Sequence, residues 1–186
     1  KKKFIIIGNQ NAITYKETFK LIKENKIWFG HSIHSGDREF GVPDDYPITA
    51  SSFRVDENGK KFVRVKGVRW FTNIDYEERY ADLILYKKYN KDDYPKYDNY
   101  DAINVNKTKE IPVDYEGVMG VPITFLDKYN PNQFEIIGMA SSAGYDKEVV
   151  GIPFIGKKDA RPLINEKNTY ARIMIKHKRR IKWKSN

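Results

Sequence analysis

Cysteine is absent from all 186 residues of this chain, and long apolar runs are absent as well. Without thiols, the chain has no disulfide framework, no zinc–cysteine site and no cysteine nucleophile. The apolar run at residues 4–7 is far shorter than the roughly 20 residues that a membrane-spanning helix needs. Lys1 to Lys3 resemble the start of a signal peptide, but Gly8 ends the apolar run that follows them. We therefore expect a cytoplasmic protein with no membrane partner.

Several catalytic motifs are also missing. The sequence contains no Gly-x-Gly-x-x-Gly string and no P-loop. Residues 141–144 do not form a Gly-x-Ser-x-Gly elbow, which argues against a serine hydrolase. Asp44 follows a proline but lacks the second carboxylate and lysine at the spacing of a magnesium-dependent nuclease. His31 and His34 lie in a loop-like segment, so we expect a solvated pair and no metal site.

The formal net charge of +9 is concentrated at the ends of the chain. Residues 172–184 hold seven Lys or Arg and no acid, whereas residues 1–171 hold 27 basic and 25 acidic residues. Such a block either contacts phosphates or is a solvated tail. The candidates for contact with nucleic-acid phosphates are Arg172, Lys176, Lys178, Arg179, Arg180, Lys182 and Lys184.

Aromatic residues are abundant enough to form a core, at 14% of the chain. Residues 76–100 hold seven of the 13 tyrosines, interleaved with Lys, Asp and Asn. Aromatic rings stack on unpaired bases while cations neutralise phosphates, so this segment is compatible with a nucleic-acid surface. The same rings would equally cover a modest core, and both interpretations remain open.

The first 30 residues predict an α/β arrangement. Residues 4–7 form a continuous apolar run, typical of a strand buried on both faces of a parallel sheet. A helix is predicted next, with Thr14 as N-cap and Glu17 completing a capping box. Residues 27–29 predict a second buried strand. Strand, helix and strand in this order predict a parallel crossover.

Antiparallel pairing is predicted after this crossover. A long surface loop is expected over residues 31–52, followed by a hairpin over residues 53–65 with an Asn-Gly turn. A further strand over residues 68–74 makes the sheet mixed. The remaining expected elements are a short helix near residues 78–85 and strands at 123–125, 134–138 and 169–175.

Six segments of the chain resemble the EcoRI-type adenine-specific DNA methyltransferases. They are residues 4–16, 23–30, 70–73, 97–101, 120–126 and 129–138. The resemblance implies transfer of a methyl group from S-adenosylmethionine to the exocyclic amine of adenine in double-stranded DNA. The family's catalytic motif is Asn/Asp-Pro-Pro-Phe/Tyr, and this chain contains no Pro-Pro pair. The chain therefore resembles the C-terminal portion of such an enzyme, inactive alone, with no catalytic, cofactor-binding or metal-binding residue and no bound cofactor.

The resemblance also implies a division of the chain. Residues 1–79 would form the C-terminal half of a methyltransferase-type Rossmann-like mixed sheet, with its antiparallel strand at the edge. Residues 80–186 would form an irregular α+β region that recognises DNA. The candidates for contact with the target base are Trp70, Phe71, Asn73 and Asn9. Packing in the core is the competing interpretation of the two rings.

Two other classes of function remain open. One is a stand-alone nucleic-acid-binding domain without catalysis. The other is an interaction domain, since a bare sheet edge favours homodimerisation.

Overall fold

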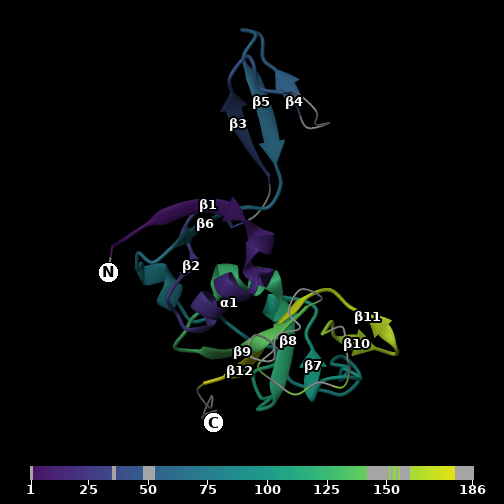
Figure 1. The fold of residues 1–186 in the computed structure, drawn as a ribbon. Helices are drawn as coiled ribbons and strands as arrows, with labels where there is room; N and C mark the ends of the chain where they lie inside the picture. Colours follow the sequence, from purple (N-terminus) through teal and green to yellow (C-terminus); the bar gives the residue numbers. More distant parts are fainter. Residues whose placement is uncertain are drawn as a thin grey trace.

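The computed structural model describes residues 2–34, 37–47, 53–141, 151, 153, 155 and 160–178. Within these residues the fold is a mixed α/β arrangement in which strands dominate. One α-helix and four short 3-10 helices connect four small sheets in the described part of the chain (Figure 1). The fold class is therefore α/β, with more strand than the sequence predicts.

The first sheet has the order β1-β6-β2. Its strands are β1 (Ile5–Asn9), β6 (Val68–Thr72) and β2 (Trp28–Phe29). Both outer strands pair antiparallel with β6, so β1 and β2 run in the same direction. They are joined by the 3-10 helix η1 (Gln10–Thr14) and the helix α1 (Lys16–Lys23). The predicted crossover is thus present, but the antiparallel strand lies at the centre of the sheet, so the prediction of an edge position was wrong.

Strand β1 is not buried. Ile5, Ile6 and Ile7 are 59%, 55% and 48% exposed, so the prediction of a strand buried on both faces was wrong. Strand β1 pairs only with β6 among the described strands, which leaves its other edge without a partner there. A continuous apolar run indicates that a strand needs cover on two faces, but it does not supply the covering layer.

Helix α1 occupies the predicted position with a different start. Thr14 belongs to η1, where its hydroxyl donates to the Asn11 carbonyl at 2.8 Å, so the predicted capping box is absent. Phe19 and Ile22 form the buried face of the helix. Asn25 has φ +56°, a left-handed conformation that asparagine tolerates and that commonly follows a helix end.

A second sheet, of order β3-β5-β4, projects from the rest of the molecule (Figure 1). It contains β3 (Arg38–Val42), β4 (Phe53–Val55) and β5 (Lys61–Val65). The predicted hairpin is confirmed, whereas the predicted loop over residues 31–52 was wrong in part because it contains β3. None of the described residues from 37 to 66 is buried. Backbone pairing and cross-strand side-chain contacts therefore hold this sheet together without a core of its own.

The third sheet has the order β7-β8-β12-β9 and carries most of the core. Its strands are β7 (Ala102–Asn104), β8 (Val118–Pro122), β12 (Arg172–His177) and β9 (Phe134–Ala140). Strands β7 and β8 are parallel and the other pairs are antiparallel. The two later predicted strands correspond to β9 and β12.

The segment after β8 is the 3-10 helix η4 (Ile123–Lys128), so the predicted strand at residues 123–125 was wrong. Both Phe125 and Leu126 are buried, which consecutive residues of a half-buried strand would not be. The predicted helix near residues 78–85 is reduced to η2 (Glu77–Tyr80). The other short elements are η3 (Thr108–Glu110), β10 (Leu163–Ile164) and β11 (Lys167–Asn168). No helix in the described ranges is long and apolar enough to span a membrane.

The tyrosine-rich segment contributes to the core. Tyr94, Tyr97 and Tyr100 are all buried. The Tyr97 hydroxyl donates to Asn104 Oδ1 at 2.8 Å, and burial raises the pKa of Tyr97. A Cβ at Gly120 would lie 2.8 Å from a Tyr97 ring carbon, so glycine is required beneath this ring. Of the two interpretations of the tyrosine-rich segment, a nucleic-acid surface or cover for the core, these three rings follow the second.

A buried ion pair joins the first and third sheets. Arg69 on β6 donates from Nε to Asp127 Oδ1 on η4 at 3.2 Å, and the two side chains are only 3% and 8% exposed. Arg69 also donates to the His34 carbonyl at 2.8 Å and to the Val68 carbonyl at 2.9 Å. Burial raises the pKa of Asp127, and the Arg69 guanidinium opposes that shift. One continuous apolar core also connects the two sheets and includes Phe71 on β6 and Phe134 on β9.

We expect Asp127→Leu to lower the free energy of unfolding by about 3–5 kcal/mol, because it leaves the Arg69 charge buried without a counter-charge. The double variant Arg69→Met/Asp127→Leu should recover most of that loss, because it removes both charges. Urea denaturation measures the free energy of unfolding of the wild-type chain, of the single variants Asp127→Leu and Arg69→Met, and of the double variant. Asp101→Asn is the matched control, since Asp101 pairs with Lys96 at an exposed site and should cost less than about 1 kcal/mol. Equal losses in the single and double variants would contradict the expectation.

Candidate functional site

Trp70 and Phe71 point to opposite faces of β6, because side chains alternate along a strand. Phe71 is 6% exposed and packs edge-on against Phe29 with ring centroids 5.2 Å apart. Trp70 is half-buried and lines an open pocket. Of the two rings proposed for base contact, Trp70 is accessible to a ligand and Phe71 lies in the core.

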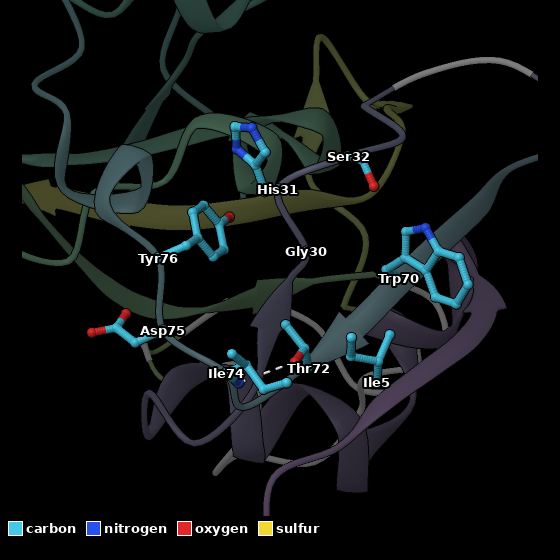
Figure 2. Close-up of a pocket in the computed structure, with 9 residues that line it drawn as sticks. All are labelled: Ile5, Gly30, His31, Ser32, Trp70, Thr72, Ile74, Asp75 and Tyr76. Carbon is cyan, nitrogen blue, oxygen red and sulfur yellow. Dashed lines mark hydrogen bonds between the residues drawn. The ribbon is translucent and has the colours of Figure 1, made fainter.

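The pocket beside Trp70 has a volume of about 420 Å³. Figure 2 shows Trp70 and Ile5 on one side of it and His31 and Tyr76 on the other. Gly30 lies against Trp70, and a Cβ at this position would lie 3.0 Å from Trp70 Cβ. The absence of a side chain at Gly30 thus lets the indole pack closely on the neighbouring strand. The complete lining is Ile5, Gly30, His31, Ser32, Trp70, Thr72, Ile74, Asp75 and Tyr76.

The polar groups of the pocket are mostly engaged with the protein. The Tyr76 hydroxyl donates to the Phe29 carbonyl at 2.9 Å, and burial is the main cause of its raised pKa. Asp75 accepts a hydrogen bond from the Tyr80 hydroxyl at 2.9 Å and pairs with Arg79 at 3.6 Å. The pocket therefore offers mainly apolar and aromatic surface, which suits a flat heterocyclic ring better than a charged ligand.

The imidazole of His31 packs edge-on against Tyr76, with ring centroids 5.6 Å apart. His31 Nδ1 lies 3.7 Å from Glu78 Oε2, and the His31 and His34 ring centroids are 6.2 Å apart. No group of three or more His, Asp or Glu side chains in the described ranges is arranged to hold a metal ion. His31 therefore stands as a hydrogen-bonding group at the pocket rim.

Asn9 and Asn73 do not face the pocket beside Trp70. Asn9 Oδ1 accepts from the Asn11 amide at 2.9 Å, and its Nδ2 donates to the Lys66 carbonyl at 3.0 Å. Asn73 Oδ1 accepts from the Phe4 amide at 2.9 Å. Both side chains therefore bind backbone groups near the two ends of β1, and the structure gives them a role in holding that strand.

The basic residues proposed for phosphate contact are only partly described. Arg172 on β12 is half-buried and donates to Asn104 Oδ1 at 3.2 Å, which joins it to the Tyr97 hydroxyl network. Lys176 is half-buried on the same strand, and Lys178 Nζ donates to the Pro131 carbonyl at 2.8 Å. The structure does not bring these three side chains to the Trp70 pocket. Arg179, Arg180, Lys182 and Lys184 lie outside the described residues.

Sequence reasoning missed Tyr76 as a lining residue and Arg69 as a buried charge beside Trp70 on β6, and it considered His31 only as a possible metal ligand. Arg69 carries one local signal, since a charged residue interrupts the apolar run of β6 and such a residue needs a buried partner. His31 and Tyr76 come from segments 45 residues apart and carry no shared motif. Only the fold brings them together.

Comparison with known proteins places the chain in a family. The family model described as "Adenine-specific methyltransferase EcoRI" matches residues 1–178. The chain is 51% identical over 180 residues to the type II methyltransferase M.EcoRI of Escherichia coli, which covers 96% of this chain and 51% of that protein. No solved structure matches.

Two further relatives come from mycoplasmas. The chain is 36% identical to the type II methyltransferase M.MgeORF184P of Mycoplasma genitalium, over 94% of this chain and 57% of that protein. It is 42% identical to the type II methyltransferase M.MpnI of Mycoplasma pneumoniae, over 73% of this chain and 44% of that protein. The chain thus spans about half the length of the curated relatives it matches. With a family model matching nearly its whole length, this chain belongs to the EcoRI family of adenine-specific methyltransferases.

Proposed function

We propose that this chain is the C-terminal, DNA-facing part of an S-adenosylmethionine-dependent enzyme that methylates the exocyclic amine of adenine in DNA. The observation that carries the proposal is the family match over residues 1–178. The relatives' names as type II methyltransferases support a place in a restriction-modification system.

The chemical step belongs to sequence outside this chain. The chain lacks any Pro-Pro pair, and it spans about half of its relatives. Asp75 is the one acid among the described residues that line the Trp70 pocket, and it already accepts from Tyr80 and pairs with Arg79, so we place the site for S-adenosylmethionine outside this pocket. S-adenosylmethionine would supply the methyl group in the complete enzyme, and this half would position the DNA.

The first sheet supports a place at the end of a larger Rossmann-like sheet. Strands β1 and β2 run parallel on either side of β6, and the free edge of β1 carries three exposed isoleucines. We propose that a strand from the other half of the enzyme pairs with this edge. In the chain alone, the same edge would favour pairing with a second copy.

Trp70 is the base-contacting residue in this proposal. Its indole lines a pocket that is large enough for a purine and offers mainly apolar and aromatic surface. An adenine removed from the duplex would stack on this ring, as bases do on aromatic side chains. Ser32 and His31 at the rim would supply hydrogen-bonding groups for its edge.

We expect the chain alone to bind duplex DNA and to transfer no methyl group from labelled S-adenosylmethionine. Fluorescence anisotropy over several salt concentrations measures the binding, whose affinity should fall steeply with salt if phosphates are contacted. Methyl incorporation by the isolated chain would overturn its assignment as a non-catalytic part. Absence of binding even at low salt would overturn its DNA-facing role. If the full-length protein encoded by the gene bound DNA but transferred no methyl group, the alternative hypothesis of a nucleic-acid-binding domain without catalysis would be favoured.

Trp70→Ala should weaken binding of an oligo-deoxyadenosine strand by roughly 5- to 150-fold, which corresponds to the loss of about 1–3 kcal/mol of base stacking. Trp70→Phe should retain most of the affinity because it keeps a ring. Tyr170→Ala is the matched control, since Tyr170 is 85% exposed and does not line the pocket. Equal affinities of the wild-type chain and Trp70→Ala would exclude Trp70 from base contact.

Ile6→Lys should abolish self-association of the chain, because a charge on an edge strand opposes edge-to-edge pairing. Ile6 pairs with Phe71, one position from the Ile7–Trp70 pair, so its side chain faces away from the Trp70 pocket. Analytical ultracentrifugation over a range of concentrations measures the mass. Ile84→Lys is the control at an exposed site outside the sheet. If the wild-type chain stayed monomeric at every concentration, the expectation that two copies pair through β1 would be contradicted.

A further inference from the structure

A second groove, with a volume of about 760 Å³, lies at the junction of the first and third sheets. Gln10 follows the carboxyl end of β1 directly, and His34 follows β2 along the chain. Ligands of open α/β sheets bind outside the carboxyl ends of parallel strands. The opposite wall comes from η3 and η4, so two parts of the chain that are distant in sequence form the groove.

The floor of the groove is electrically balanced. It is formed by Arg69 and Asp127, whose buried ion pair leaves no net charge at this point. The Arg69 guanidinium already donates four hydrogen bonds within the protein, two to the Asp127 carboxylate and one each to the His34 and Val68 carbonyls. The floor is therefore a support for the walls and not itself a free anion-binding group.

The walls of the groove are positive. Lys109 and Lys128 both line it, both are exposed, and neither forms an ion pair with an acid in the described ranges. Their neighbour Lys107 differs, since it pairs with Glu110 at 3.5 Å. The charge of Lys128, which follows Asp127 directly in η4, opposes the burial-induced rise in the pKa of Asp127. Two free cations thus flank a neutral floor.

Further hydrogen-bonding groups line the same groove. The hydroxyls of Thr108 and Thr124, the amide of Gln10 and the imidazole of His34 all belong to the lining. Lys, Thr, Gln and backbone groups of this kind bind phosphate oxygens and fix the register of a protein on DNA. Among the groove residues, no Phe, Tyr or Trp is present, so the groove has no platform for stacking a base.

We propose that this groove binds the sugar-phosphate backbone of duplex DNA, with Lys109 and Lys128 contacting phosphates. The inference rests on the proposed function and adds a site outside the basic C-terminal block. Arg69 in the groove and Trp70 in the base pocket are consecutive residues of β6. One strand therefore connects the groove for the backbone with the pocket for the base.

The test uses the whole chain and a fluorescent duplex at several salt concentrations. Lys109→Gln/Lys128→Gln should lower the slope of log affinity against log salt by about 2, because each phosphate contact contributes about 0.9. Binding should weaken to a similar degree for duplexes of different sequence, since phosphate contacts do not read bases. Lys109→Arg/Lys128→Arg should restore the wild-type slope.

Lys87→Gln/Lys91→Gln is the matched control, since it removes the same charge from two exposed lysines that do not line the groove. Its slope should equal the wild-type slope within error. An unchanged slope in Lys109→Gln/Lys128→Gln, with wild-type DNA binding intact, would overturn the groove and leave the proposed function standing. A wild-type chain that binds no duplex would overturn both.

Two further measurements test whether a change in DNA binding has another cause, namely lost stability or a site for free phosphate. Urea denaturation of both double variants should give midpoints equal to wild type, because all four lysines are exposed; a lowered midpoint restricted to the groove variant would assign these lysines to stability and overturn the proposal. Inorganic phosphate added at constant ionic strength should displace the duplex only at high concentration. If low phosphate concentrations displaced the duplex fully from the wild-type chain but not from Lys109→Gln/Lys128→Gln, the groove would be a site for free phosphate. That result would overturn the proposal that the groove binds the DNA backbone.

Discussion

The buried ion pair between Arg69 and Asp127 constrains how the two main parts of the fold meet, because loss of either partner alone would leave the other charge buried. Arg69 comes from the central strand of the first sheet, and Asp127 comes from the 3-10 helix that follows β8. Two charges at this depth are tolerated only when they pair and their remaining hydrogen bonds are met. The geometry of the pair therefore holds η4 against β6. The walls of the positive groove depend on the same contact.

The central position of β6 has a second consequence. Because β6 pairs on one side with β1 and on the other with β2, the outer edge of β1 is left open among the described strands. A strand with three consecutive exposed isoleucines is poorly suited to water, and such edges invite pairing with another chain. The relatives that the chain matches are about twice as long, and the proposed function assigns this edge to a strand from the rest of the enzyme.

The candidate site was only partly predictable. The family resemblance made Trp70 a candidate for base contact, with packing in the core as the competing interpretation, and the structure leaves its indole in the lining of an open pocket. Phe71, one residue further, lies in the core because alternation along β6 turns it to the other face. Asn9 and Asn73 attracted attention as polar side chains near strand ends, yet their partners are backbone groups of the chain itself. Such partners are fixed by the fold and leave no signal in the local sequence.

By itself, the sequence determined the family, through the segments that resemble the EcoRI-type methyltransferases. It also determined that a helix follows the first strand, the hairpin at 53–65 and the strands that became β6, β9 and β12, because apolar periodicity and turn residues act over a few neighbouring positions. Only the tertiary structure decided which apolar strand stays exposed, which tyrosines are buried and where Arg69 finds its counter-charge. These outcomes depend on contacts between separate segments of the chain, such as the pair of Arg69 and Asp127, which are 58 positions apart. Local patterning states what a segment needs to bury, and the packing of distant segments decides what covers it.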